Sequence, residues 1–283
     1  MKAGITACSD GRPAERKQQH TELISILADC GIEAVTADHI YACRDAFSGT
    51  DEERAADLMG FYEDEEIRCI FDISGGDLAN GVLKYLDWDR IASSSKVFWG
   101  YSDLTTVINA IYAKTGKESV LYQVRNLVSG DGALQRKRFS DYISGRNEEL
   151  FAVHCNFLQG DSMEGVVAGG NTRCLLKLAG TEYWPDMEGK ILLLEAYGGE
   201  SGAIATALNQ LELLGVFQQV AGVLLGTFTR YEQAGLRMSV FDLLKMHIPE
   251  NLPVAQTLDI GHGTDAKAIF IGRHFTASAD GGN

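Results

Sequence analysis

The first half of the chain alternates short apolar runs with longer amphipathic ones. Residues 1–7 and 32–36 are short apolar runs, and the stretch 14–30 between them repeats apolar residues at helical spacing. Residues 67–73 (IRCIFDI) form a continuous apolar run, as expected for a parallel strand that is covered on both faces. Strand patterns that alternate with helical patterns in this way predict βαβ units and a parallel sheet.

The alternation continues beyond that strand. Residues 50–53 (TDEE) have the sequence of a capping box, so a helix is predicted to begin there. A helix over 78–86, a strand over 96–99 and a helix over 104–114 follow. We therefore predict an N-terminal α/β domain with a parallel sheet over residues 1–127.

Residues 128–150 interrupt the rhythm with a polar stretch, and we interpret them as a linker. Strand and helix patterns then resume and predict a second, mixed α/β domain over residues 151–283. Its predicted strands are 151–157, 165–168, 190–195, 220–226, 254–258 and 268–271, and its predicted helices are 171–179, 203–214 and 240–246. The fold class is therefore α/β, in two domains.

The charge balance excludes two classes of partner. The chain of 283 residues has 25 Lys and Arg against 39 Asp and Glu, which gives a formal net charge of −14. A phosphate backbone is bound through clustered basic residues, and anionic membranes attract the same clusters. We expect neither nucleic acid nor a membrane as a partner, while a local basic pocket for a small anionic substrate stays open.

The cysteines and the N-terminus indicate the cellular setting. The six cysteines are far apart, with neither CxxC nor Cys/His spacing, which argues against a disulfide framework and against a zinc site. No run of 18 apolar residues and no signal-peptide core occurs. We expect a soluble protein of a reducing cytoplasm that uses no metal and no cofactor.

Ser102 is the first candidate for chemistry. It lies in Gly100-Tyr-Ser-Asp103, between an apolar strand and a helix. A nucleophile elbow uses this geometry to expose a hydroxyl beside a helix N-terminus, where free amides can stabilise an oxyanion. Leu104 stands where the elbow usually has a second glycine, and Ser102 or Asp103 serving only as an N-cap is the alternative.

A glycine pair forms a second candidate. Residues 74–77 (SGGD) also connect an apolar strand to a helix. Paired glycines let the backbone approach a ligand and present an amide, although a tight turn has the same sequence. Neither GxGxxG nor GK[ST] is present, so no dinucleotide or triphosphate site is indicated.

Two residues of the second half are candidates for acid and base. Glu195 ends an apolar strand, where a carboxylate is nearly buried and needs a donor, unless it is solvated at the strand end. His262 lies in a glycine-flanked loop, which suits a general base, although a structural role is the alternative. Ser102, Glu195 and His262 occur in an order that supports acyl transfer.

These residues lie in segments that resemble the LD-carboxypeptidase family of serine peptidases, which includes the microcin C self-immunity proteins. The matching segments follow the family's order and span nearly the whole chain. They are GTDEERAADL (49–58), FDISGG (71–76), YLDWDRI…KVFWGYSDLT (85–105), AGGNTRCLLKLAGTEYWPDMEGKILLLE (168–195) and DIGHGTDAKAIFIG (259–272).

The resemblance implies an active site between the two domains. It implies Ser102 as nucleophile, Glu195 as the acid that orients the base, and His262 as the base. The amides of Asp103 and Gly76 would then form the oxyanion hole.

The resemblance also implies groups that bind substrate. Gly75 would contact the substrate, and a carboxypeptidase must recognise a free carboxylate. Arg125, Arg173 and Arg230 are the candidates for that contact. The sequence departs from the family at 121–126 (LYQVRN) and 196–200 (AYGGE), both near the expected substrate contacts, so the substrate is left open.

The resulting expectation is a homodimeric serine carboxypeptidase that hydrolyses a C-terminal amide bond of a small peptide, such as the L,D bond of murein tetrapeptide. One alternative is a microcin C-type peptidyl-nucleotide amidase that gives self-immunity. Another is a non-catalytic binding module on the same fold. An ordinary α/β-hydrolase esterase is disfavoured by the missing elbow glycine and by the five matching segments.

Overall fold

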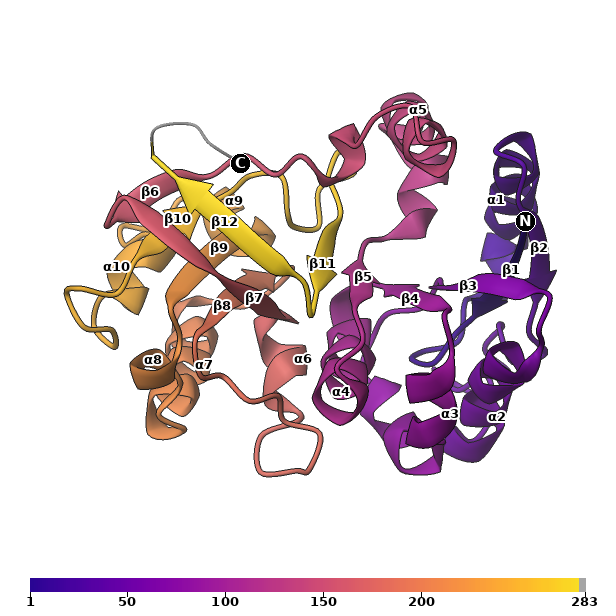
Figure 1. The fold of residues 1–283 in the computed structure, drawn as a ribbon, viewed down its shortest axis with the longest axis horizontal. Helices are drawn as coiled ribbons and strands as arrows, with labels where there is room; N and C mark the ends of the chain where they lie inside the picture. Colours follow the sequence, from indigo (N-terminus) through magenta and orange to yellow (C-terminus); the bar gives the residue numbers. More distant parts are fainter. Residues whose placement is uncertain (280–283) are drawn as a thin grey trace.

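Two six-stranded sheets lie side by side in the computed structural model, which describes residues 1–279 (Figure 1). Helices pack on both sheets, so both halves have the α/β architecture that the alternating pattern predicts. None of the helices among these residues is long and apolar enough to span a membrane.

The first sheet carries its strands in the order β11-β5-β4-β3-β1-β2. The pairs among β1 to β5 are all parallel, whereas β11 runs antiparallel to β5. The strands are β1 (Lys2–Thr6), β2 (Glu33–Thr36), β3 (Ile67–Asp72), β4 (Val97–Gly100), β5 (Ser119–Leu121) and β11 (Ile269–Ile271). The parallel sheet predicted for the N-terminal half is therefore present.

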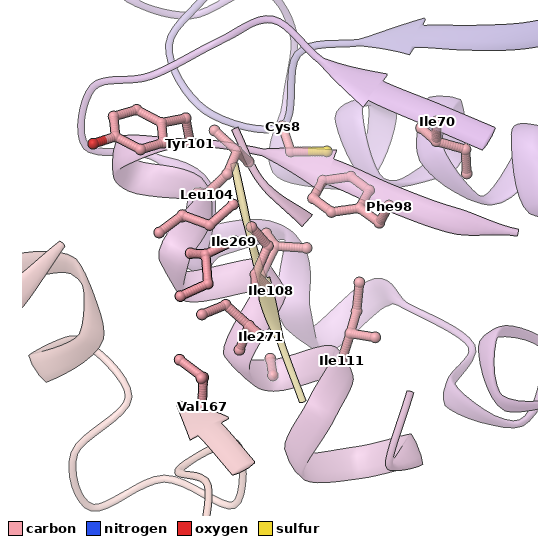
Figure 2. Packing of buried hydrophobic residues seen from close by; sticks show 14 of the residues in the cluster. Cys8, Ile70, Phe98, Tyr101, Leu104, Ile108, Ile111, Val167, Ile269 and Ile271 are labelled. Atoms are coloured by element: carbon pink, nitrogen blue, oxygen red, sulfur yellow. The ribbon is translucent and has the colours of Figure 1, made fainter. Parts of the chain in front are cut away.

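Apolar residues that alternate along β3 and β4 fill both faces of this sheet. Ile70 and Phe98 pack on one side with Ile108 (Figure 2). Phe71 and Trp99 pack on the other. The first side is covered by α2 (Asp51–Glu63), α3 (Trp88–Ser93) and α4 (Thr105–Thr115), and the second by α1 (Lys17–Asp29) and α5 (Gly132–Ile143). Burial on both faces explains the unbroken apolar run at 67–73.

The predicted capping box starts α2. The Glu53 amide donates to Thr50 Oγ1 at 3.2 Å, and the Thr50 amide donates to Glu53 Oε2 at 2.8 Å. This reciprocal pair satisfies two amides that the first helical turn leaves without partners.

The second sheet is mixed and carries its strands in the order β12-β7-β8-β9-β10-β6. Strands β7 to β10 pair in parallel, and β12 and β6 add antiparallel edges. The strands are β6 (Asn156–Gln159), β7 (Ser162–Asn171), β8 (Lys190–Ala196), β9 (Gly222–Phe228), β10 (Val254–Gln256) and β12 (His274–Ser278). The helices of this half are α6 (Thr172–Leu176), α7 (Ser201–Leu213), α8 (Val216–Gln219), α9 (Thr229–Gln233) and α10 (Val240–Leu244).

Several elements differ from the sequence-based expectation: the segment predicted as a helix over 78–86 is a 3-10 helix, the strand predicted over 151–157 begins only at 156, and β12 was not predicted. The stretch interpreted as a linker, 128–150, contains helix α5, which buries Gln135 and Phe139. The strand predicted near 268–271 does not join the second sheet, because β11 pairs with β5 at the edge of the first (Figure 1). Ile269 and Ile271 there pack beside Ile108 (Figure 2).

Helix α4 joins the two halves. Asn109 exchanges two hydrogen bonds with the backbone of Gly169 in β7, at 2.8 and 2.9 Å, and Thr105 Oγ1 accepts from the Asn171 amide at 3.0 Å. The close approach requires a glycine at position 170, where a Cβ would lie 2.8 Å from Thr105 Oγ1. The start of α4 is thereby fixed against the ends of β7 and β8.

Candidate active site

Ser102 occupies a sharp turn between β4 and α4. Its φ of +59° is in the left-handed region, which non-glycine residues rarely adopt. The hydroxyl therefore stands at the start of a short 3-10 turn over Ser102–Leu104 that leads into α4. Leu104, in the place of the usual elbow glycine, is fully buried in the core, so the turn forms without that glycine.

His262 and Glu195 lie in line with this hydroxyl. His262 Nε2 is 3.2 Å from Ser102 Oγ, and His262 Nδ1 is 2.8 Å from Glu195 Oε2. The three side chains come from the turn after β4, the end of β8 and the loop after β10. The structure therefore brings together the three residues that the sequence nominated, in a hydroxyl–imidazole–carboxylate arrangement.

Two further side chains satisfy the Glu195 carboxylate, which is fully buried. Tyr101 donates to Oε2 at 3.1 Å, and Asn171 Nδ2 donates to Oε1 at 3.0 Å. Burial and the neighbouring Glu195 raise the pKa of Tyr101, so its hydroxyl stays a donor. Such donors offset the cost of burying the carboxylate.

Sequence reasoning missed both donors, although each had a signal. Tyr101 directly precedes Ser102, and Asn171 ends the strand beside Glu195, where the two residues are register partners. Tyr101 and Asn171 both act through Glu195. Their contact with this carboxylate can be identified only when the order of the strands is known.

The loop that carries His262 is held by helix α5. Gln135 Nε2 donates to the carbonyls of Thr264 and Ala266, each at 2.8 Å, and Gln135 Oε1 accepts from Tyr122 at 2.9 Å. The stretch that the sequence presented as a linker therefore fixes the loop of the candidate base.

Aromatic rings enclose the imidazole. The rings of Tyr101 and Tyr197 lie 5.0 and 5.1 Å from that of His262, and the Arg230 guanidinium lies over Tyr197 at 4.8 Å. Tyr197 belongs to the segment in which this sequence departs from the family pattern. Arg230, a candidate for carboxylate binding, thus stacks on a ring that contacts the histidine.

The glycine pair lies beside Ser102. A Cβ at Gly75 would lie 4.0 Å from Ser102 Cβ, and a Cβ at Gly76 would overlap the Asp10 carboxylate at 2.1 to 2.4 Å. Gly76 also has a φ of +130°. Its conformation and its surroundings therefore both require glycine.

Buried Asp72 fixes the start of this glycine loop. It accepts from the amides of Cys8 and Ser74, each at 2.7 Å. Burial raises the pKa of Asp72, and the hydrogen bonds from Ser74 and Cys8 oppose this shift.

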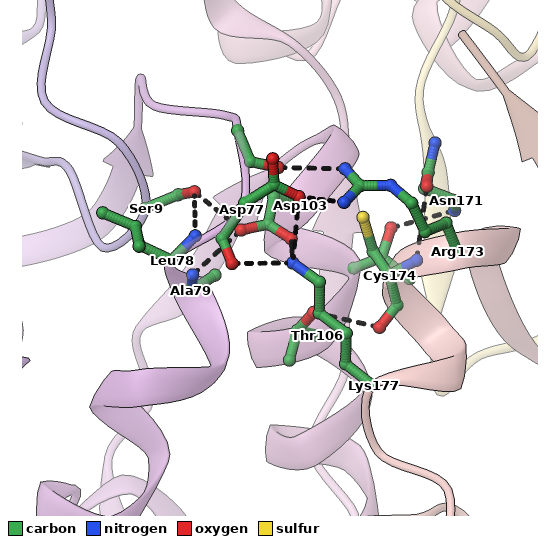
Figure 3. A network of polar contacts seen from close by, with 12 residues as sticks. Ser9, Asp77, Leu78, Ala79, Asp103, Thr106, Asn171, Arg173, Cys174 and Lys177 are labelled. Atoms are coloured by element: carbon green, nitrogen blue, oxygen red, sulfur yellow. Dashed lines mark hydrogen bonds and ion pairs between the residues drawn. The ribbon is translucent and has the colours of Figure 1, made fainter. Parts of the chain in front are cut away.

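The Asp103 side chain holds the turn that carries Ser102 in place. The buried carboxylate accepts from Ser9 Oγ at 2.6 Å and from the Ala79 amide at 2.9 Å, and it pairs with Lys177 of the second half (Figure 3). The residue after Ser102 therefore ties the turn to both halves of the chain.

Arg173 and Arg125 have different surroundings. Arg173 pairs with Asp77 and donates to the Gly76 carbonyl at 3.1 Å (Figure 3). Arg125 is partly buried and donates to Gln123 Oε1 at 2.9 Å and to the Ser74 carbonyl at 3.4 Å. Arg173 is thus paired with an acid, whereas the acceptors of the Arg125 side chain among residues 1–279 are neutral.

A cavity of about 850 Å³ opens in front of Ser102 and His262. Its polar wall contains Gly75, Gly76, Arg125 and Arg173, and its apolar wall is formed by Ala203, Ile204, Ala207, Leu208 and Phe228. We call it the large cavity. Both departures from the family pattern border it, through Gln123 and Arg125 and through Tyr197, Gly198 and Gly199.

Within residues 1–279, no group of three or more His, Cys, Asp or Glu side chains is arranged to hold a metal ion. At the site itself the structure shows a hydroxyl, an imidazole and a carboxylate.

Comparisons with known proteins identify the family of the chain. Residues 3–122 match the LD-carboxypeptidase N-terminal domain, and residues 164–276 match the LD-carboxypeptidase C-terminal domain. The chain is 28% identical over 250 residues to the microcin C7 self-immunity protein MccF of Escherichia coli, covering 76% of this chain and 72% of that protein. It is 27% identical over 275 residues to a probable murein peptide carboxypeptidase of Bacillus subtilis, covering 92% and 84%.

A solved structure shares the fold. The structure of MccF in complex with glutamyl sulfamoyl guanosine superposes with a TM-score of 0.89, at 22% identity, over 99% of this chain and 93% of that one. This likeness extends through both sheets and agrees with the two domain matches. The chain belongs to the LD-carboxypeptidase family of peptidases.

Proposed function

We propose that the protein is a serine carboxypeptidase that removes the C-terminal residue of a small peptide, such as the residue held by the L,D bond of a murein tetrapeptide. The observation that carries the proposal is the alignment of Ser102 Oγ, the His262 ring and the Glu195 carboxylate at 3.2 and 2.8 Å. Relatives named as murein peptide carboxypeptidases support the choice of substrate class.

The proposed reaction starts at Ser102. Its Oγ attacks the scissile carbonyl carbon while His262 Nε2 takes the hydroxyl proton, and Glu195 holds the imidazole in the required tautomer. The carbonyl oxygen becomes an oxyanion, which the amides of Asp103 and Gly76 stabilise. His262 then gives its proton to the leaving amine as the C–N bond breaks, and water releases the acyl group by the same steps.

A peptidyl-nucleotide amidase that confers self-immunity is the second candidate. The large cavity, at about 850 Å³, has room for more than a single amino acid beside Ser102, and the relative MccF has an immunity function in its name. In this reaction the same triad would cleave the amide that links a peptide to a nucleotide.

One experiment separates these functions from a binding module. The protein is incubated with murein tetrapeptides and with aminoacyl-nucleotide conjugates, products are read by mass spectrometry, and a serine-directed phosphonate is added in parallel. Carboxypeptidase activity releases the terminal residue of the tetrapeptide, and phosphonate labels Ser102 and abolishes this release. A protein that cleaves neither substrate and takes up no phosphonate is a binding module.

We further propose that the enzyme works as a homodimer in the cytoplasm. The family resemblance supports the dimer, and six free thiols suit a reducing compartment. Light scattering after gel filtration and fractionation of the native host test the two points separately.

A further inference from the structure

A second, smaller cavity of about 320 Å³ also borders His262. Its wall includes Arg12, Arg16, Gln19, Asn126 and Gly263. We call it the arginine cavity. Gln123, Arg125 and His262 line both cavities, so the two meet at the imidazole and at the Arg125 side chain.

Three arginines face this cavity without a counterion. Arg12, Arg16 and Arg125 make no ion pair with any carboxylate of residues 1–279. This arrangement occurs in a chain with 14 more acidic than basic residues. Unpaired like charges at a partly buried wall repel one another, so an anion bound among them would be stabilised.

The electrostatics of the group agree with this arrangement. Burial and the nearby charges of Arg12 and Arg16 lower the pKa of Arg125, and Asp72 only partly opposes them. Burial and Arg16 likewise lower the pKa of Arg12. A bound carboxylate or phosphate would reverse both shifts, because an opposite charge favours the ionised guanidinium.

The direction of proton transfer indicates which cavity holds the departing fragment and which holds the acyl part of the substrate. In acyl transfer the histidine passes its proton to the leaving amine, so the departing fragment lies on the histidine side of the scissile bond. The arginine cavity contains His262 with its flanking Gly261 and Gly263. Ser102 and the glycine pair line only the large cavity, which is therefore the place of the acyl part.

We propose that the arginine cavity is the subsite for the departing fragment and that Arg12, Arg16 and Arg125 select a fragment with a negatively charged group. The inference rests on the proposed function and deepens it. Arg125 borders both cavities, so it is the arginine that contacts the carboxylate of a single departing residue. Arg12 and Arg16 border only the arginine cavity, where they add positive charge to that of Arg125. A nucleotide phosphate on the departing fragment offers the same chemistry.

Paired substrates test the proposal. We would measure kcat/KM for a murein tetrapeptide that ends in a free carboxylate, for the same peptide as its C-terminal carboxamide, and for an aminoacyl nucleotide phosphoramidate. The enzymes are the wild type, the double variant Arg12→Gln/Arg16→Gln, and the single variant Arg16→Glu. Arg16 is exposed and makes no side-chain hydrogen bond or ion pair among residues 1–279, so its reversal leaves the fold intact.

A matched control separates the local effect from the change in net charge. Arg68 and Arg90 are exposed and line a different surface hollow, so Arg68→Gln/Arg90→Gln removes the same two charges elsewhere. We expect the Arg12/Arg16 double variant to lose about tenfold or more in kcat/KM on the acid peptide. The loss on the carboxamide is expected to be at least fivefold smaller, and the control changes neither value.

The outcomes separate the two proposals. A larger loss on the acid peptide than on the phosphoramidate identifies a carboxylate as the natural group, and the reverse identifies a phosphate. If hydrolysis depends on Ser102 but both arginine variants lose kcat/KM equally on the acid peptide and on its carboxamide, the subsite is wrong. The proposed function is unaffected by that result. Absence of Ser102-dependent hydrolysis of all three substrates would reject the proposed function and the subsite with it.

Discussion

His262 Nε2 lies 3.2 Å from Ser102 Oγ, although 160 positions separate the two residues in the chain. The contact depends on independent anchors. Helix α4 ties the serine turn to β7, Asp103 pairs with Lys177, and Gln135 holds the histidine loop. Each of these anchors and each member of the triad has a measurable consequence.

Replacing Ser102 by Ala is expected to lower the hydrolysis rate by ~10³-fold or more, because the attacking oxygen is lost. Alanine also has a Cβ, so the strained φ of +59° is kept and the melting temperature should stay within about 1–2 °C of the wild type. Steady-state kinetics and calorimetry check the two parts. The control is Ser95→Ala, on an exposed loop away from the site. Turnover like the wild type in Ser102→Ala would remove this residue from the mechanism.

Replacing Glu195 by Gln is expected to lower kcat/KM by ~10²–10⁴-fold. The carboxylate faces three donor groups, from Tyr101, Asn171 and His262, and an amide offers only one oxygen to them. The imidazole then loses its acceptor and the tautomer it needs. Tyr101→Phe keeps the carboxylate and removes one donor, so kcat/KM of this variant should fall by about tenfold. A Glu195→Gln enzyme that is as active as Tyr101→Phe would contradict the orienting role.

Replacing Gln135 by Leu is expected to loosen the loop that carries His262. The change leaves two carbonyls and the Tyr122 hydroxyl without partners in a buried place, at about 1–3 kcal/mol for each unsatisfied group. We expect kcat to fall several-fold with little change in KM, and faster amide hydrogen exchange at 259–266. Gln18→Leu, on the exposed side of α1, is the control. Unchanged exchange in the loop would show that α5 does not hold it.

Activity is expected to survive exhaustive chelation. The proposed nucleophile is activated by a histidine, and the described residues offer no cluster of metal ligands. The assay compares turnover before and after dialysis against EDTA. Loss of activity that zinc restores would overturn the serine mechanism.

Replacing Asp141 by Asn is expected to destabilise the fold at neutral pH but not in acid. Hydrogen bonds from Lys137 and Arg146 lower the pKa of this carboxyl. A lowered pKa means that the stabilisation is complete above the ordinary aspartate value of about 3.9 and is lost as the pH falls through the folded value. The difference in melting temperature from the wild type should therefore be present at pH 7 and shrink as the pH falls below the ordinary aspartate value of about 3.9. The exposed Asp38→Asn variant is the control, and a difference that is independent of pH would contradict the linkage.

The elements that could be predicted from the sequence are those whose environment repeats along the chain. Strand β3 is buried at every position except Arg68, and four of its six residues are apolar, so the pattern is plain from residues 67–73 alone. Helix α5 is not predicted because its buried face includes Gln135 and Asp141, which hydrophobic periodicity assigns to the solvent-facing side. Strand β11 was expected, but its partner was not, because three residues of local sequence do not determine which sheet edge they join.

The residues of the candidate site likewise include some that could be predicted from the sequence and some that could not. Ser102, Glu195 and His262 could be nominated because each lies at the end of a strand or in the loop after one, and the carboxyl ends of parallel strands gather at one edge of a sheet. Tyr101 and Asn171 could not, because they are defined by a contact to Glu195 across strands. The engagement of Arg173 with Asp77 likewise depends on the way the two halves dock.

The pairing of β11 with β5 has a consequence for biosynthesis. On the ribosome, β5 is made long before β11, so the sheet that carries the candidate nucleophile keeps an unpaired edge until residues 269–271 emerge. His262 is translated only a few residues earlier and reaches its place at almost the same moment. The candidate site is therefore expected to be completed late in synthesis, and a chain that stalls before this strand exposes an unpaired strand edge that chaperones and proteases can recognise.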